Sequence, residues 1–140
     1  LASIFSNLAL ARRGIGDTAG AETYFRRALK AAEVHENRLV APILTDLADL
    51  RCARGAHAEA MHLLDRAQPL MRAEYPDDAW RAAWVDNTRG ACLLRQKELD
   101  AAARLIRSSS PVILRRWAAD ALYGYDARLR MQAILRSTSA

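Results

Sequence analysis

The chain has 140 residues, of which 51% are hydrophobic and 26% are charged. This apolar content is too high for an intrinsically disordered chain and is sufficient for one compact domain with a buried core. Arg, Asp or Glu interrupts every apolar stretch well before the ~20 residues that a membrane-spanning helix needs, so we expect no membrane segment.

The net charge of +5 comes from the C-terminal end of the chain. Residues 1–100 carry 14 basic and 14 acidic side chains, which cancel, whereas residues 101–140 carry seven arginines against two aspartates. A basic end of this kind is compatible with an anionic partner, nucleic acid included.

Targeting and redox signals are few. The chain begins at Leu1 and not at Met, and no charged segment followed by an apolar run precedes a cleavage site. We therefore expect no signal peptide, and we expect the native chain to begin further upstream.

Cys52 and Cys92 are too few for a disulfide framework and lie within helical patterns. This favours buried, reduced thiols and a cytoplasmic protein, with a redox pair or a metal ligand as the alternative.

Helix-forming residues dominate every window of the sequence. Glycine and proline are sparse, with six and four residues, and no segment alternates polar and apolar residues as a strand would. Turn-forming residues interrupt the helical pattern at 14–17, 36–37, 54–56, 75–78, 96–97 and, more weakly, 117–120. The sequence therefore predicts an all-α fold of about seven helices, joined by short turns into antiparallel hairpins.

A pattern of residue sizes repeats along the chain. In the second helix of each predicted hairpin, a small residue is followed four positions later by a large apolar one. The small residues are Ala21, Ala60 and Ala102, and the large ones are Phe25, Leu64 and Ile106. Another small residue, in the first helix, keeps the same offsets of 39 and 42 residues at Ala9, Ala48 and Gly90.

This pattern has a physical explanation in helix packing. Small residues let two antiparallel helices approach closely, and a large apolar residue one turn later fills the groove between them. One hairpin cannot bury its apolar face alone. We therefore expect the hairpins to stack into a right-handed α-solenoid.

The order of these residues resembles a known family. Leu8-Ala9, Gly16-Asp17, Ala21, Phe25 and Ala28-Leu29 together resemble a tetratricopeptide repeat. The lengthened period and the start at Asn7 resemble its kinesin-light-chain-like subclass. In bacteria such arrays often form the C-terminal part of serine/threonine protein kinases or of transcriptional regulators.

The resemblance implies a single domain over residues 1–140. Its repeats would cover about 1–36, 37–76 and 77–118, followed by a C-terminal capping helix at about 119–136. A stripe of apolar residues in this helix would face inward, with three arginines outside. The inner residues are Leu122, Tyr125, Leu129 and Ile134, and the outer ones are Arg128, Arg130 and Arg136.

No constellation in the sequence indicates catalysis, a metal ion or a cofactor. His57 and His62 are five residues apart, which does not place them on one helix face. Motifs for a phosphate-binding loop or a nucleophile elbow are missing from the sequence. Asp77-Asp78 follow a proline at a predicted helix start and are expected to cap it. Ser108–Ser110 before Pro111 indicate a kinked helix with solvated serines, more than a phosphorylation site. The sequence therefore predicts no enzyme.

In tetratricopeptide arrays the first helix of each hairpin lines a concave groove, so the resemblance implies a binding surface. The implied groove residues are Ser6, Asn7 and Arg13 in the first repeat, Thr45, Asp46 and Asp49 in the second, and Trp84, Asn87 and Arg95 in the third. Amide and carboxylate side chains can bond the backbone of an extended peptide, and Trp84 would be its apolar anchor. The alternative is that these polar residues form an ordinary solvated face.

The sequence therefore predicts a non-catalytic protein–protein interaction module, a fragment of a larger bacterial regulatory or kinase-like protein. Its partner would be a peptide or helix of another protein, or a second copy of the chain. The alternative is a nucleic-acid-binding helical repeat that uses the arginine-rich C-terminal end. Helical-repeat RNA binders keep a near-constant period, which the offsets of 39 and 42 residues fit poorly.

Overall fold

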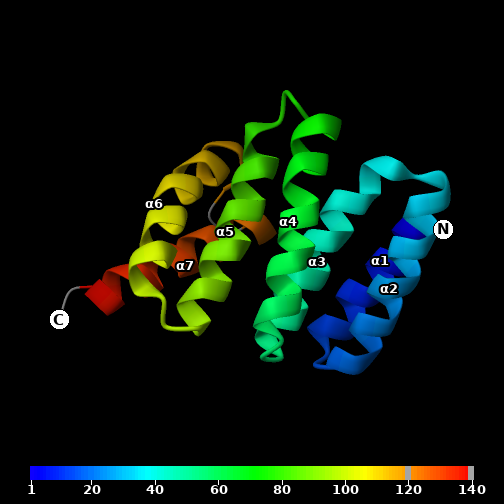
Figure 1. Cartoon of the computed structure of the whole chain (residues 1–140), viewed down its shortest axis with the longest axis horizontal. Coiled ribbons are helices and arrows are strands. Elements are labelled where there is room, and N and C mark those ends of the chain that lie inside the picture. Colours follow the sequence, from blue (N-terminus) through cyan, green and yellow to red (C-terminus); the bar gives the residue numbers. More distant parts are fainter. Residues whose placement is uncertain (119–120, 139–140) are drawn as a thin grey trace. The chain divides into compact units, whose positions relative to one another are not determined.

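The computed structural model describes residues 1–118 and 121–138, and this part of the chain contains seven α-helices and no strand (Figure 1). The helices are α1 (Ala2–Gly14), α2 (Thr18–His35), α3 (Val40–Ala53), α4 (His57–Glu74), α5 (Ala79–Arg95), α6 (Leu99–Arg116) and α7 (Leu122–Thr138), with a short 3-10 helix, η1 (Asn37–Leu39), before α3. The all-α prediction is confirmed. The expected start of the capping helix, residues 119–120, lies outside the described residues.

The turns inside the three hairpins share one backbone feature. Each contains a residue with a positive φ, which is 84° at Gly16, 88° at Gly55 and 63° at Lys97. Glycine adopts this conformation without steric cost, whereas a lysine tolerates it less well. In the first of these turns the Asp17 carboxylate caps α2 by accepting a hydrogen bond of 2.9 Å from the Gly20 backbone N–H.

The chain divides into two compact units, Leu1–Leu70 and Met71–Ala140, with α4 contributing residues to both. Each unit is described by itself. The expected single domain and its superhelical handedness concern the arrangement of the whole chain, and both stay predictions.

The core of the first unit forms where α1, α2 and α3 meet. Ala9, Ala21 and Ala28 have no exposed surface, and the fully buried Phe25 ring lies in the same apolar cluster. Leu44 and other apolar side chains of α3 complete this cluster. The expectation that small residues of the repeat pattern are buried, with a large residue one turn later, is thus confirmed here.

The second unit repeats this arrangement with a glycine in the first helix. A Cβ atom added to Gly90 would lie 2.7 Å from Cγ1 of Ile106, so α5 and α6 approach closely at this point. Ile106 packs with Ala102, Ala103 and Ile134, all of which are buried. Close packing between α5 and α6 therefore depends on the missing side chain of Gly90.

The orientation of α7 differs from the prediction. Ile134 is fully buried as expected, but Leu122, Tyr125 and Leu129 are 62%, 43% and 38% exposed. The expected inner stripe is thus wrong for these three residues. Helix α7 packs mainly on α6 (Figure 1). The apolar side chains that it buries are those of Ala127 and Ile134, and the three expected inner residues lie on other sides of the helix.

A substitution in α4 tests the packing of the small residues. Ala60 is fully buried, whereas Ala58, two residues away, is exposed. We expect Ala60→Leu to overpack the helix contact and to lower the free energy of unfolding by about 1–3 kcal/mol. Ala58→Leu should change it by less than ~0.5 kcal/mol. Urea unfolding measures the change in the free energy of unfolding for each variant. Equal changes would show that the helix contact at Ala60 can accommodate a larger side chain.

Candidate functional site

The first unit brings together two of the residues expected to line the groove. The Arg13 guanidinium of α1 donates a hydrogen bond to the Asp49 carboxylate of α3 at 2.5 Å. The Arg13 and Asp49 side chains are 35% and 17% exposed, so solvent screens this ion pair only in part. The pair therefore joins the two first helices on one polar face.

Three more of the expected residues lie on these helices. Asn7 of α1 is exposed, and Ser6 of α1 and Asp46 of α3 are half-buried. Thr45 is different, because it is fully buried and its hydroxyl donates a hydrogen bond of 2.8 Å to the Ala41 carbonyl in its own helix. Thr45 therefore does not belong to an accessible surface, which corrects its assignment to the groove.

Trp84 does not line an accessible groove either. It is only 6% exposed and belongs to an aromatic cluster with Trp80, Trp117 and Tyr123. The Tyr123 ring of α7 lies 5.0 Å from the rings of both Trp80 and Trp84, between ring centroids. The tryptophan expected to anchor a peptide instead packs against the C-terminal helix of its own unit.

Asn87 is the centre of a buried polar network in the second unit. Its amide nitrogen donates hydrogen bonds of 3.0 Å to the Ser109 hydroxyl and 2.9 Å to the Ser110 hydroxyl, both on α6. Its amide oxygen accepts a hydrogen bond of 2.9 Å from the Arg130 guanidinium of α7. Asn87 is fully buried, so it too is removed from the predicted groove.

This network also corrects two other expectations. Ser109 and Ser110 are 3% and 0% exposed and are not solvated, although Ser108 is exposed. Arg130 is half-buried and does not lie outside the helix with the other two arginines. Arg95, the last expected groove residue, is exposed at the end of α5.

A family model described as a tetratricopeptide repeat matches residues 1–73, more than half of the chain. The chain belongs to the tetratricopeptide repeat family. A search of curated proteins found no match. Members of this family typically act as non-catalytic scaffolds that bind other proteins. None of the helices in the described residues combines the length and the apolar composition that a membrane-spanning segment requires.

An ion-pair network, which the sequence did not indicate, stabilises the first unit of this tetratricopeptide repeat chain. Arg51 of α3 donates to Glu22 of α2 at 2.7 Å and to Glu59 of α4. The Arg54 guanidinium lies 3.7 Å from the same Glu22. Hydrogen bonds with Glu22 and then Glu59 raise the pKa of Arg51 above its ordinary value, so the two carboxylates stabilise its charged form. This network joins three helices of the first unit and is structural.

The cysteines of the tetratricopeptide repeat chain differ from the expectation. Both Cys52 and Cys92 are buried, as expected. Neither is a free thiol, so the expectation of reduced thiols is wrong. The predicted cytoplasmic location depended on those thiols and loses that support.

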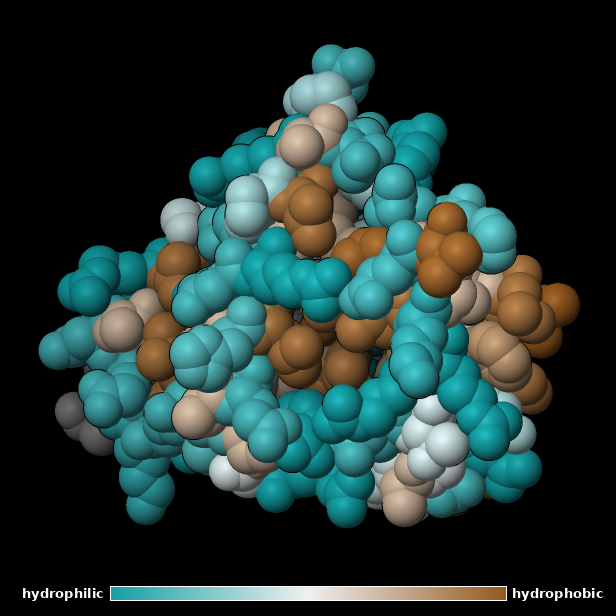
Figure 2. Space-filling model, turned by 45° about the vertical axis from the view of Figure 1, so that its right-hand side comes forward, coloured by the Kyte–Doolittle hydropathy of each residue, from teal (hydrophilic) through white to brown (hydrophobic). Residues whose placement is uncertain are grey.

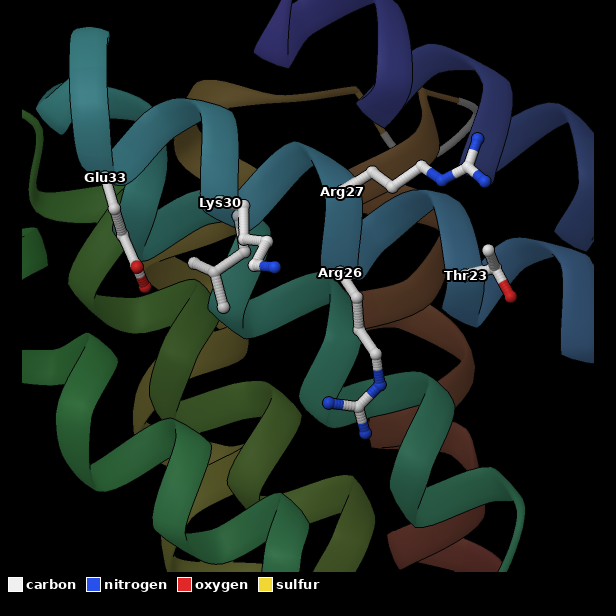
Figure 3. Close-up of a pocket in the computed structure, with 6 residues that line it drawn as sticks. Thr23, Arg26, Arg27, Lys30 and Glu33 are labelled. Carbon is white, nitrogen blue, oxygen red and sulfur yellow. The ribbon is translucent and has the colours of Figure 1, made fainter.

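A shallow depression runs beside α2, on the second helix of the first repeat (Figure 3). Its lining residues are Thr23, Arg26, Arg27, Leu29, Lys30 and Glu33. All of them belong to one helix and most are exposed, whereas small-molecule sites are concave and bury most of the surface of their ligand. This depression is therefore part of a charged helix face.

The aromatic cluster leads to a prediction that reverses the sequence-based role of Trp84. Because its ring packs against Trp80 and Tyr123, we expect Trp84→Ala to lower the free energy of unfolding by about 3–5 kcal/mol. Leu135→Ala, at a residue that is 54% exposed on α7, should have little effect. Denaturant unfolding measures both. Trp84→Ala with wild-type stability would place this side chain on the surface.

The Asn87 network gives a second prediction for this unit. Asn87→Ala removes an amide that two hydroxyls and one guanidinium share, which leaves those groups with unmade hydrogen bonds in a buried site. We expect a loss of about 1–3 kcal/mol in the free energy of unfolding. The matched control is Asn37→Ala, at an exposed residue of η1. If Asn87→Ala and Asn37→Ala lower the free energy of unfolding by the same amount, the hydrogen bonds of the Asn87 network do not stabilise the second unit.

Proposed function

We propose that this chain is a non-catalytic protein–protein interaction module that holds an extended segment of a partner protein along α1 and α3. The observation that carries the proposal is the ion pair between Arg13 and Asp49, which joins these two first helices. Asn7, six residues before Arg13 on α1, is exposed. Tetratricopeptide repeats generally mediate interactions between proteins, which supports this assignment.

The chemistry of this face suits a peptide backbone. Asn7 offers both an amide donor and an amide acceptor, so it can pair with one N–H and one C=O of an extended chain. Leu10, three residues later on α1, is 37% exposed and offers an apolar contact. Ser6 and Asp46 extend the polar face, and the Arg13–Asp49 pair holds its two sides together. Leu10 thus takes the anchoring role that the sequence assigned to Trp84.

The wider context of this module is also a proposal. The resemblance of its repeats to the kinesin-light-chain-like subclass supports a place in a larger bacterial regulatory or serine/threonine kinase-like protein. A cytoplasmic location is not part of this proposal, because neither cysteine is a free thiol.

The test begins with a random peptide library displayed on phage and selected against the immobilised chain. A selected peptide is then synthesised and titrated against the chain and its variants. We expect Asn7→Ala with Leu10→Ala to weaken binding by at least ~tenfold, about 1.4 kcal/mol, because the peptide loses a backbone partner and an apolar contact.

The matched control removes the same kinds of side chain elsewhere in the unit. Val34 is 70% exposed and Asn37 is exposed, so Val34→Ala with Asn37→Ala should leave the affinity within about twofold. Equal losses in both double variants would contradict a site on α1 and α3. Failure to select any peptide, together with salt-dependent binding of random RNA or DNA, would favour the nucleic-acid alternative.

A further inference from the structure

A pocket of about 310 Å³ lies in the first unit between α2, α3 and α4. This volume is at the lower end of the range of about 300–1,000 Å³ that is typical of small-molecule sites. The lining residues of the pocket are Arg26, Leu47, Glu59, His62, Leu63 and Arg66. Three helices contribute these residues, whereas a single helix lines the shallow depression beside α2.

The floor of the pocket is apolar. Leu47 of α3 is buried, Leu63 of α4 is half-buried, and both belong to the apolar core of the first unit. On the face of the first unit that Figure 2 brings forward, apolar side chains lie at the bottom of a hollow and hydrophilic side chains surround it. An apolar floor under a polar rim suits a ligand with an apolar body and one polar end.

Ion pairs bound the pocket along the helices. On one side Arg51 of α3 donates hydrogen bonds to Glu22 of α2 and to Glu59 of α4. On the other side Arg66 of α4 donates a hydrogen bond of 3.0 Å to Glu33 of α2. Glu59 and Arg66 are seven residues apart, or about 10 Å along the axis of α4. This length would hold only about three residues of an extended peptide, so the pocket fits a small molecule better.

The charges of the pocket do not balance. The charged lining residues and their ion-pair partners comprise four arginines and three glutamates, which leaves a net charge of +1. They are Arg26, Arg51, Arg54, Arg66, Glu22, Glu33 and Glu59.

Arg26 is the arginine with the weakest pairing. Its Nε atom lies 4.0 Å from Glu22, and that carboxylate already pairs with Arg51 and Arg54. Within the described residues Arg26 makes no hydrogen bond. The pocket therefore has one cation that a single anionic group can complete.

Two side chains of the rim offer donors to such a group. Figure 3 shows that Arg26 and Arg27 leave α2 in different directions, and only Arg26 lines this pocket. The His62 imidazole of α4 is exposed and has neither a hydrogen bond nor an ion pair among the described residues. A guanidinium binds a carboxylate through two parallel N–H donors, and an imidazole N–H can add a third.

We propose that this pocket binds a small amphipathic carboxylate. The carboxylate pairs with Arg26 and accepts a hydrogen bond from His62, and the apolar body covers Leu47 and Leu63. A monoanion brings the number of acids level with the number of arginines, whereas a cation would add to the surplus charge. The site does not depend on the face of α1 and α3 that the proposed function uses.

The test uses octanoate as the probe, with acetate and octylammonium as its controls. Each is titrated into the whole chain, labelled with carbon-13 at its leucine methyl groups, and the shift of the Leu63 methyl signals gives the affinity. We expect octanoate to bind at least ~tenfold more tightly than acetate, which lacks the apolar body, and than octylammonium, which has the opposite charge.

Variants on α2 locate the carboxylate. Arg26→Gln should weaken octanoate binding at least ~fivefold, because the ligand loses its charged donor. Arg26→Lys keeps the charge but not the paired donors and should restore only part of the affinity. The matched control is Arg27→Gln, which removes the same charge from the next exposed residue and should change the affinity by less than about twofold. Melting curves check that each variant is folded.

Four outcomes would overturn the proposal. One is an equal loss of octanoate binding in Arg26→Gln and Arg27→Gln, which would indicate attraction by net charge alone. Another is equal affinity for octanoate and octylammonium. The third is no shift of the Leu63 methyl signals with octanoate up to about 10 mM. The last is binding of a short peptide of alternating Leu and Glu that octanoate does not displace, which would assign the pocket to a protein partner. None of these outcomes tests the face on α1 and α3.

Discussion

Close approach of antiparallel helices is the constraint on which both units depend. Two helices can pack this tightly only where one of them carries a very small side chain. Ala9, Ala21 and Ala28 meet this condition in the first unit, and Gly90 meets it against Ile106 in the second. The apolar clusters form around these contacts, and the polar groups of each unit are arranged between helices that the contacts have already brought together.

The local features of the fold could be predicted because each has a local cause. Glycines at 16 and 55 and the small residues at fixed offsets gave the turns and the hairpins, and the structure has both. The environment of Trp84 and Asn87 could not be predicted in this way. A family pattern tells which positions of a first helix point toward a groove. It does not tell that two residues of α7, much later in the chain, contact these positions: Tyr123 packs against Trp84, and Arg130 donates a hydrogen bond to Asn87. The orientation of α7 was missed for a related reason, because its two faces are both rich in apolar residues and periodicity alone cannot choose between them.

The first-helix face of α1 and α3 combines an amide, an ion pair and one exposed leucine. Under the function proposed above, these groups suit a peptide backbone that needs hydrogen-bond partners.

The position of Arg130 sets a limit on how far the chain can be shortened. Asn87 lies in α5, yet its amide oxygen depends on a donor that the chain supplies 43 residues later. A version that ended after α6 would leave this oxygen without the arginine and would uncover the rings of Trp80 and Trp84. The α5–α6 hairpin is therefore not an independent repeat that can be cut out and transferred to another array. Its folding unit extends through Ile134, and any exchange of repeats between related proteins must carry α7 along with it.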